Sequence, residues 1–251
     1  METTVSNFFR SVLPENGIYA LVTKGINDQY LKHTPLNDLD TFLRSVQVAS
    51  ADTKDCWFAL ANYSQGFYTV TDATGKTVKR FRTQDNAARL RCLFLDVDVG
   101  EDKPYQTTVQ ALQALREFCQ ATRLPIPTIV YSGSGGLHVY WAFTVSVSKD
   151  EWRKLAVNLH NATVKHGFAA DPMRTRDCAS ILRVPGSNNF KHGGVNRVSL
   201  QYVAEPMEYD YYLGLLHGYE SQDDKTHSVE QEILNAVLKI DWASLGVASL
   251  S

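Results

Sequence analysis

The sequence lacks any apolar run long enough to span a bilayer, and its N-terminus lacks the pattern of a secretory signal peptide. Its four cysteines are far apart and form no C-x-x-C pair, so neither a disulfide framework nor a zinc knuckle is indicated. Internal repeats and low-complexity tracts are also missing. We therefore expect a soluble, cytoplasmic protein whose 251 residues can bury a substantial core, with the cysteines as core thiols.

A strong net charge is missing as well, because 25 Lys and Arg residues against 27 Asp and Glu residues leave −2 at pH 7. The basic residues are nevertheless concentrated in residues 76–91 and 165–200. In residues 205–232, by contrast, nearly all the charged residues are Asp or Glu. This uneven distribution is typical of a phosphate-binding surface on a neutral protein, although a charged run is more often a solvated face.

Two acids lie at the end of the apolar run RCLFLDVDVG, residues 91–100. The run is short, rich in bulky apolar residues and closed by Gly100, which favours a buried strand over a helix. Side chains alternate along a strand, so Asp96 and Asp98 are expected on the same face. Two carboxylates on one face are suited to holding a divalent metal ion.

Helix and strand signals alternate along the rest of the chain. Thr34 and Pro35 predict the N-cap and the first position of a helix that runs to about residue 46. Thr107 or Thr108 is expected to cap a second helix, and residues 148–151 form a capping box for a third. Gly75 lies in the turn of a predicted hairpin. Strands are expected at residues 17–23, 57–63, 67–70, 78–81, 128–131, 137–143, 181–184 and 197–203.

The order of elements over residues 91–203 is strand, helix, strand, strand, helix, strand, which is the ferredoxin-like or RRM-like arrangement. The predicted fold class is therefore α+β, with an RRM-like sheet over residues 91–205, flanking helices and an N-terminal αβ module over residues 1–90. A helical segment at 209–219 precedes the polar stretch 222–228, which is the best boundary in the chain. Residues 221–251 are expected to be a helical tail or a linker to a further domain.

The loop at residues 131–138, YSGSGGLH, connects two predicted strands. Glycines let a backbone approach phosphate closely and turn its amides inward, so such a loop can bind an anion. His138 could donate to the same phosphate from a ring nitrogen. The alternatives are an ordinary hairpin and a buried histidine satisfied by a backbone carbonyl.

A third stretch, residues 168–191, carries one acid before a proline and several cations. Asp171 could complete a three-carboxylate cluster, or it could only cap a helix or turn. Arg183 and Lys191 are candidates to bind phosphate, because a guanidinium fits phosphate oxygens bidentately and an ammonium acts as a point charge. The alternatives are a strand arginine paired with a carboxylate and an exposed loop lysine.

Taken together, these stretches resemble the archaeo-eukaryotic primase (AEP) superfamily, in particular the primase-polymerases of plasmids and phages. LDVD at 95–98 resembles the Asp-x-Asp motif of that family, and SGSGGLH at 132–138 resembles its serine and histidine motif. AAD at 169–171 looks like the third acid, and ILRVPGSNNFK at 181–191 is similar to a segment common downstream in these replication proteins. The resemblance covers roughly residues 57–191.

The resemblance implies a catalytic domain over residues 1–220 that joins nucleoside triphosphates on a single-stranded DNA template and primer, as a primase, a polymerase or both. It implies a two-metal site for Mg²⁺ or Mn²⁺. A replicative helicase is a further expected partner, in a bacterial, archaeal or phage-infected cell. The implied metal ligands are Asp96, Asp98 and Asp171. The implied nucleotide-binding residues are Ser132, Ser134, His138, Arg183 and Lys191.

Some assignments stay open. The family often has Ser two places before the histidine, where this chain has Gly136, so the hydroxyl comes from Ser134 or Ser132, or a backbone amide replaces it. Asp177 is an alternative to Asp171 as the third acid.

A non-catalytic replication initiator of the same fold and a haloacid-dehalogenase-like phosphatase are the alternative functions. Template or primer phosphates are expected to contact Arg80, Arg82, Arg89 and Arg91.

Overall fold

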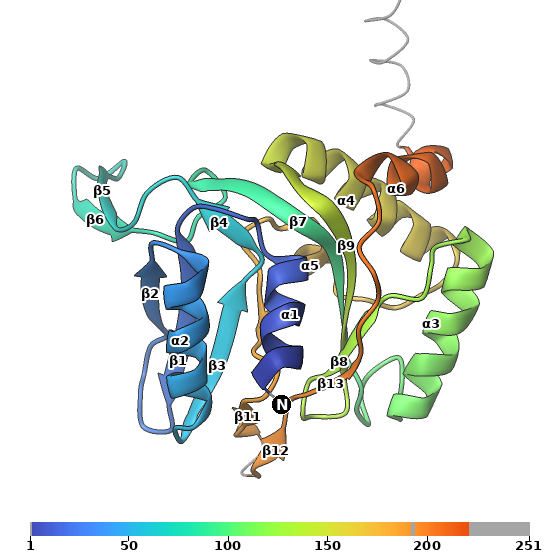
Figure 1. The fold of residues 1–251 in the computed structure, drawn as a ribbon, viewed down its shortest axis with the longest axis horizontal. Helices are drawn as coiled ribbons and strands as arrows, with labels where there is room; N and C mark the ends of the chain where they lie inside the picture. The colour runs from blue at the N-terminus through green and yellow to red at the C-terminus, as the bar shows by residue number, and fades with distance from the viewer. Residues whose placement is uncertain (1, 192–193, 221–251) are drawn as a thin grey trace, which may run out of the picture.

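The structure is a computed structural model that describes residues 2–191 and 194–220. It shows two large antiparallel sheets side by side (Figure 1) and two further two-stranded sheets. The four-stranded sheet contains, in spatial order, β10 (Ile181–Arg183), β3 (Lys54–Ala59), β1 (Tyr19–Gly25) and β2 (Lys32–Leu36). The five-stranded sheet contains, in spatial order, β13 (Ser199–Tyr202), β8 (Thr128–Tyr131), β9 (Leu137–Ser148), β7 (Ala87–Val97) and β4 (Ala61–Tyr63).

Helix α1 (Glu2–Val12) lies between the two sheets (Figure 1). The ring of Phe8 contacts Phe58 of β3 at a centroid distance of 6.0 Å and Tyr140 of β9 at 5.1 Å, both edge to face. All three rings are fully buried, so one apolar core joins the sheets.

The remaining elements surround these sheets. Ser148 forms the expected capping box of α4 (Lys149–Lys165), and Thr107 is the expected N-cap of α3 (Thr108–Thr122), where it also forms a capping box with Gln110. The other helices and strands are α2 (Leu39–Ser50), β5 (Tyr68–Thr71), β6 (Thr77–Arg80), α5 (Pro172–Arg176), β11 (Asn188–Asn189), β12 (Asn196–Arg197), α6 (Tyr209–Leu216) and the 3₁₀ helix η2 (His217–Tyr219). The pairs β5-β6 and β11-β12 form the two-stranded sheets.

Strand β7 is covered by two different partners along its outer edge. Its first half pairs with β4, in a register that reaches Leu90. Further along, the indole Nε1 of Trp152 on α4 donates to the Cys92 carbonyl at 2.8 Å, and the Asp171 amide donates to the Asp96 carbonyl at 2.8 Å. Helix α4 and the start of α5 therefore satisfy backbone groups that a strand would otherwise pair.

The α+β class is confirmed, and so are the hairpin of β5 and β6 and the burial of all four cysteines as free thiols. The central order β8-β9-β7 is that of a ferredoxin-like sheet. The predicted strand at 181–184 differs from this arrangement, because β10 pairs with β3 in the other sheet.

The predicted helix start at Thr34 and Pro35 is wrong. Both residues lie in β2, which among the described residues pairs only with β1 and is therefore an edge strand. A proline is tolerated there because the sheet needs no backbone N–H donor on the open side of an edge strand. The helix begins instead at Leu39, because Asp38 accepts a hydrogen bond from the Thr41 amide at 2.7 Å as its N-cap.

The proposed division at residue 90 falls within β7, and the chain crosses between the sheets at β4 and again at β10. The division stays a prediction, and the tail over 221–251 lies outside the described residues. Within 2–191 and 194–220, no helix combines the length and apolarity that crossing a bilayer requires.

Candidate active site

Asp96 lies near the end of β7, directly opposite His138 on β9. Its side chain is 16% exposed. Burial raises the pKa of Asp96 to about 6, the nearby Arg174 guanidinium opposes this shift, and the negative charges of Asp98 and Asp171 add to it. A carboxylate in this environment is stabilised by any cation that reaches it.

Asp171 is brought to Asp96 by the backbone. Its amide donates to the Asp96 carbonyl, and its side chain caps the short helix α5 by accepting from the amides of Met173 and Arg174 at 2.9 and 3.1 Å. Pro172 follows at the first helical position, where it loses no hydrogen bond. The expected capping role and the expected proximity to the first acid therefore coexist in one residue.

Arg174 joins the two carboxylates. Its Nε lies 3.0 Å from Oδ2 of Asp96 and 3.2 Å from Oδ2 of Asp171, and its Nη1 donates to the Ile181 carbonyl at 2.9 Å. The sequence analysis did not single out this residue as part of the site. The available signal was the Asp-x-x-Arg spacing at a helix start, which places both side chains on one face.

Asp98 lies just past β7 and is more open, with 57% of its side chain exposed. Its Oδ2 lies 2.7 Å from Nζ of Lys103, a second cation that the sequence analysis did not identify. In this arrangement no group of three or more His, Cys, Asp or Glu side chains among the described residues gathers closely enough to hold a metal.

The donor chemistry nevertheless suits Mg²⁺ or Mn²⁺, since carboxylate oxygens are hard ligands and Asp96 and Asp171 already share one positive group. A metal ion bound by both would replace Arg174 Nε as their common cation. To bind the metal as well, Asp98 would have to give up its ion pair with Lys103. Protein cations thus neutralise all three acids.

The loop after β8 turns tightly at glycines. Gly133 and Gly135 have φ of +79° and +92°, and the Ser132 amide donates to the Gly136 carbonyl at 2.9 Å. A Cβ at position 136 would lie 2.7 Å from the Val97 carbonyl and 3.1 Å from Ser132 Oγ. Gly136 therefore leaves no room for a serine, and the buried Ser132 hydroxyl occupies the adjacent space, whereas Ser134 is exposed.

Asn189 holds this loop against the downstream segment. Its Nδ2 donates to the Ser132 carbonyl at 2.8 Å, and its Oδ1 accepts from the Lys191 amide at 3.0 Å. The side chain is 1% exposed. Two of the predicted nucleotide-binding segments are thus fixed to each other, although the Lys191 side chain itself is exposed.

His138 is neutral in this environment. Burial, followed by the positive charges of Arg183 and Arg174, lowers the pKa of His138 to about 3. Its Nε2 lies 3.7 Å from Oδ1 of Asp96, which is too long for a hydrogen bond, and its buried Nδ1 has no partner among the described residues. The histidine is not satisfied by a backbone carbonyl as the alternative interpretation required, so a ligand is a suitable partner for its ring.

Arg183 reaches the site from the other sheet. Its Nη1 lies 2.5 Å from Oδ1 of Asp55, and its guanidinium lies 4.8 Å from the ring centroid of Trp57. The same Asp55 oxygen accepts from the Phe190 amide at 3.1 Å. The structure therefore gives Arg183 the carboxylate partner of the alternative interpretation, and that pair fixes the guanidinium near His138.

Three of the four arginines predicted to contact nucleic acid donate hydrogen bonds to groups of the protein. Arg82 donates to the Ala179 carbonyl, Arg89 donates to Ser146 Oγ at 2.9 Å, and Arg91 donates to the Thr144 carbonyl at 2.6 Å. Arg80 is exposed on the β5–β6 hairpin. A nucleic-acid role for this set stays a prediction, and both Arg80 and Arg89 are exposed.

No protein-family model and no curated protein sequence matches the chain. Several solved structures have a similar fold, including the following three. The AEP domain of the cyanophage S-2L primase-polymerase is 16% identical, with a TM-score of 0.53 over 80% of this chain and 89% of that one. The primase RepB′ is 11% identical, with a TM-score of 0.56 over 96% of this chain and 68% of that one.

The third structure is the catalytic domain of primase RepB′ in complex with initiator DNA. It is 11% identical to this chain, with a TM-score of 0.54 over 96% of this chain and 98% of that one. These similarities show that the chain has the fold of the AEP primase-polymerase domains, as its motifs led us to expect.

The Asp55 and Arg183 pair gives a stability prediction. Asp55→Ala leaves a guanidinium that is 11% exposed without its carboxylate and should lower the free energy of unfolding by about 3 kcal/mol, the cost of breaking a buried ion pair. Urea unfolding measures the change. Asp52→Ala removes the exposed partner of Lys54 and should leave the midpoint almost unchanged. Equal midpoints for the two variants would show that Asp55 does not fix Arg183.

Proposed function

We propose that this chain, which has the fold of the AEP primase-polymerases, is a template-dependent nucleotidyltransferase that joins nucleoside triphosphates on single-stranded DNA. The observation that carries the proposal is the convergence of Asp96 and Asp171 on one cation, Arg174, beside the neutral His138. The presence of initiator DNA in the RepB′ complex supports DNA as the partner.

Asp96, Asp98 and Asp171 are the residues that would hold Mg²⁺ or Mn²⁺. When bound, the metal supplies Lewis-acid stabilisation of the attacking and leaving oxygens. Arg183 presents a guanidinium already fixed by Asp55, so less conformational entropy is lost when it binds a triphosphate oxygen.

The other groups supply hydrogen bonds and charge. In this proposal the Ser132 hydroxyl and the ring of His138 donate to phosphate oxygens, and the exposed Lys191 adds a positive charge. In the reaction, the 3′-oxygen of the growing strand bonds to the α-phosphorus of the incoming nucleotide. The bond to the bridging oxygen of the β-phosphate breaks, pyrophosphate leaves, and the hydroxyl proton passes to solvent.

Nucleotide incorporation on primed and unprimed single-stranded DNA tests this proposal, with products resolved on a gel. Wild-type protein should form or extend strands with Mg²⁺ or Mn²⁺, whereas Asp96→Asn and Asp98→Asn should lower the rate by at least about a hundredfold. Asp102→Asn removes a neighbouring exposed acid and is the control that should keep activity.

Two outcomes favour the alternatives. DNA binding without any incorporation by wild-type protein would indicate a non-catalytic initiator. Release of inorganic phosphate from a simple phosphomonoester, without strand extension, would indicate a phosphatase. Circular dichroism of each variant confirms that a lost activity is not a lost fold.

Metal binding can be measured without activity. Because a ligand stabilises the state that binds it, Mn²⁺ at a hundredfold excess over its Kd should raise the free energy of unfolding by about 2.7 kcal/mol. Asp96→Asn combined with Asp171→Asn should abolish this gain, and chelation with EDTA should reverse it. A gain of the same size in the double variant would place the metal elsewhere.

A further inference from the structure

A cavity of about 400 Å³ lies between α4 and α5. Three guanidinium groups line it, from Arg153 on α4 and from Arg174 and Arg176 on α5. Gln84 and Asp177 also line the cavity. Neither Arg153 nor Arg176 has a role in the proposed chemistry described above.

The charges of this cavity are not balanced. Asp177 is its one lining carboxylate, and Oδ1 of that residue accepts from Gln84 Nε2 and from the Ala179 amide, both at 2.9 Å. Arg153 donates to Gln84 Oε1 at 3.1 Å, and Arg176 donates to the Pro172 carbonyl at 3.2 Å. Neither arginine forms an ion pair within residues 2–191 and 194–220.

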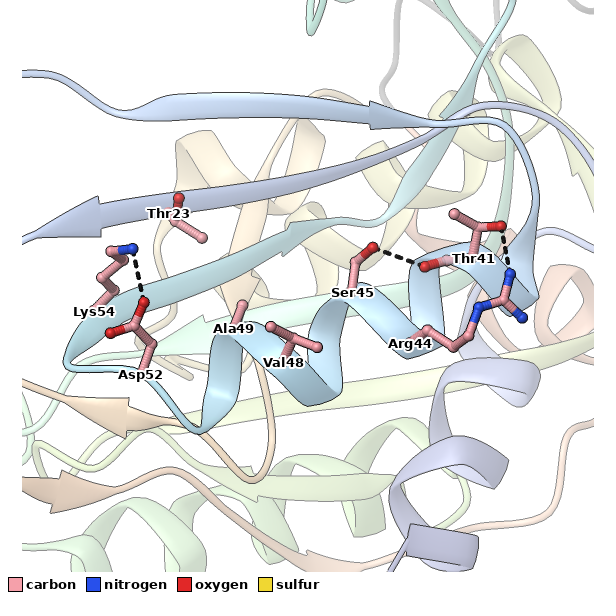
Figure 2. Close-up of a pocket in the computed structure, with 8 residues that line it drawn as sticks. All are labelled: Thr23, Thr41, Arg44, Ser45, Val48, Ala49, Asp52 and Lys54. Carbon is pink, nitrogen blue, oxygen red and sulfur yellow. Dashed lines mark hydrogen bonds and ion pairs between the residues drawn. The ribbon is translucent and has the colours of Figure 1, made fainter.

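A second pocket of about 400 Å³, formed by α2, β1 and β3, shows the contrast (Figure 2). There Lys54 lies 2.7 Å from Oδ2 of Asp52, and Arg44 donates to Thr41 Oγ1 at 2.9 Å. One of its two cations is therefore paired with a carboxylate. In the cavity at α4 and α5, Arg174 is paired with Asp96 and Asp171, but Arg153 and Arg176 have no carboxylate partner among the described residues. That cavity is therefore the better anion site.

Arg174 connects this cavity to the candidate active site, because it lines the cavity and its Nε also contacts Asp96 and Asp171. In nucleotidyl transfer the attacking 3′-hydroxyl must lie at these carboxylates. The phosphate on the 5′ side of the same nucleotide is one sugar away from that hydroxyl. The cavity adjoins these carboxylates through Arg174, so a phosphate bound in it would lie next to the attacking nucleotide.

We propose that Arg153, Arg174 and Arg176 form a binding site for the 5′-side phosphate of the nucleotide whose 3′-hydroxyl reacts. The inference rests on the proposed nucleotidyltransferase function and names a substrate contact within it. Guanidinium groups recognise phosphate oxygens bidentately. The phosphate is a diester when a primer is extended and a triphosphate when a strand is started from a single nucleotide.

The test uses the full chain and a fluorescent primer annealed to a template, with EDTA present so that binding is measured without divalent metal. Arg153→Ala combined with Arg176→Ala should weaken binding about tenfold and reduce the slope of log affinity against log salt by about one to two. Lys154→Ala combined with Arg116→Ala removes the same charge from exposed positions on α4 and α3 and should leave affinity unchanged.

A primer with an uncharged methylphosphonate as its last linkage locates the contact. With wild-type protein, the KM for this primer should be about tenfold higher than the KM for the normal primer. The Arg153 and Arg176 double variant should have the same KM for both primers. Its KM for the incoming nucleotide should equal that of wild type. For unprimed synthesis, replacing the 5′-triphosphate of the starting nucleotide by a hydroxyl should raise the KM for that nucleotide in wild-type protein but not in the double variant. The two arms show whether the site serves primers, starting nucleotides or both.

Two results would overturn the inference: equal DNA affinity of the arginine and control double variants, or an equal methylphosphonate penalty in wild type and the arginine variant. Failure of the proposed function is a different observation, namely no incorporation by wild-type protein on any template. In that case DNA binding in EDTA still reports whether Arg153 and Arg176 contact phosphate.

Discussion

The hydrogen bond from the Asp171 amide to the Asp96 carbonyl is the constraint on which the rest of the site depends. Strand β7 loses β4 as a partner halfway along, and its remaining backbone groups must be satisfied. Trp152 and Asp171 satisfy two of them, which brings a second carboxylate to Asp96. Two acids held this close require a cation, and Arg174 supplies it from the first turn of α5.

The site also depends on both sheets being in place. Arg183 comes from the four-stranded sheet, whereas Asp96 and His138 come from the five-stranded sheet, and the buried rings around Phe8 join the two. Asn189 then ties the glycine loop to the segment that carries Lys191. Most of the candidate groups are thus fixed before any substrate binds, which is the arrangement that electrostatic catalysis requires.

Local patterns in the sequence were enough to predict much of this. The acid-terminated strand, the glycine loop, one capping box, one N-cap and the α+β class follow from periodicity and turn chemistry over a few residues. Contacts between distant segments were not accessible, so Asn189 and Asp55 were missed as members of the site. Arg174 and Lys103 were missed although each contacts an acid three or five residues away. A nucleic-acid role for the basic run at 76–91 stays a prediction, and charge alone does not show that Arg89 and Arg91 donate to groups on β9. The helix start predicted at Pro35 was wrong, because only the sheet topology shows that Pro35 lies in an edge strand.

The central claim is that Asp171, and not Asp177, completes the reactive site with Asp96. The turnover number for nucleotide incorporation should fall at least about a hundredfold in Asp171→Asn. It should stay within about threefold of wild type in Asp177→Asn, because the Asp177 carboxylate is engaged by Gln84 and Ala179. Measuring both variants side by side on one primed template tests the claim most directly. Wild-type turnover in Asp171→Asn, or loss confined to Asp177→Asn, would contradict it.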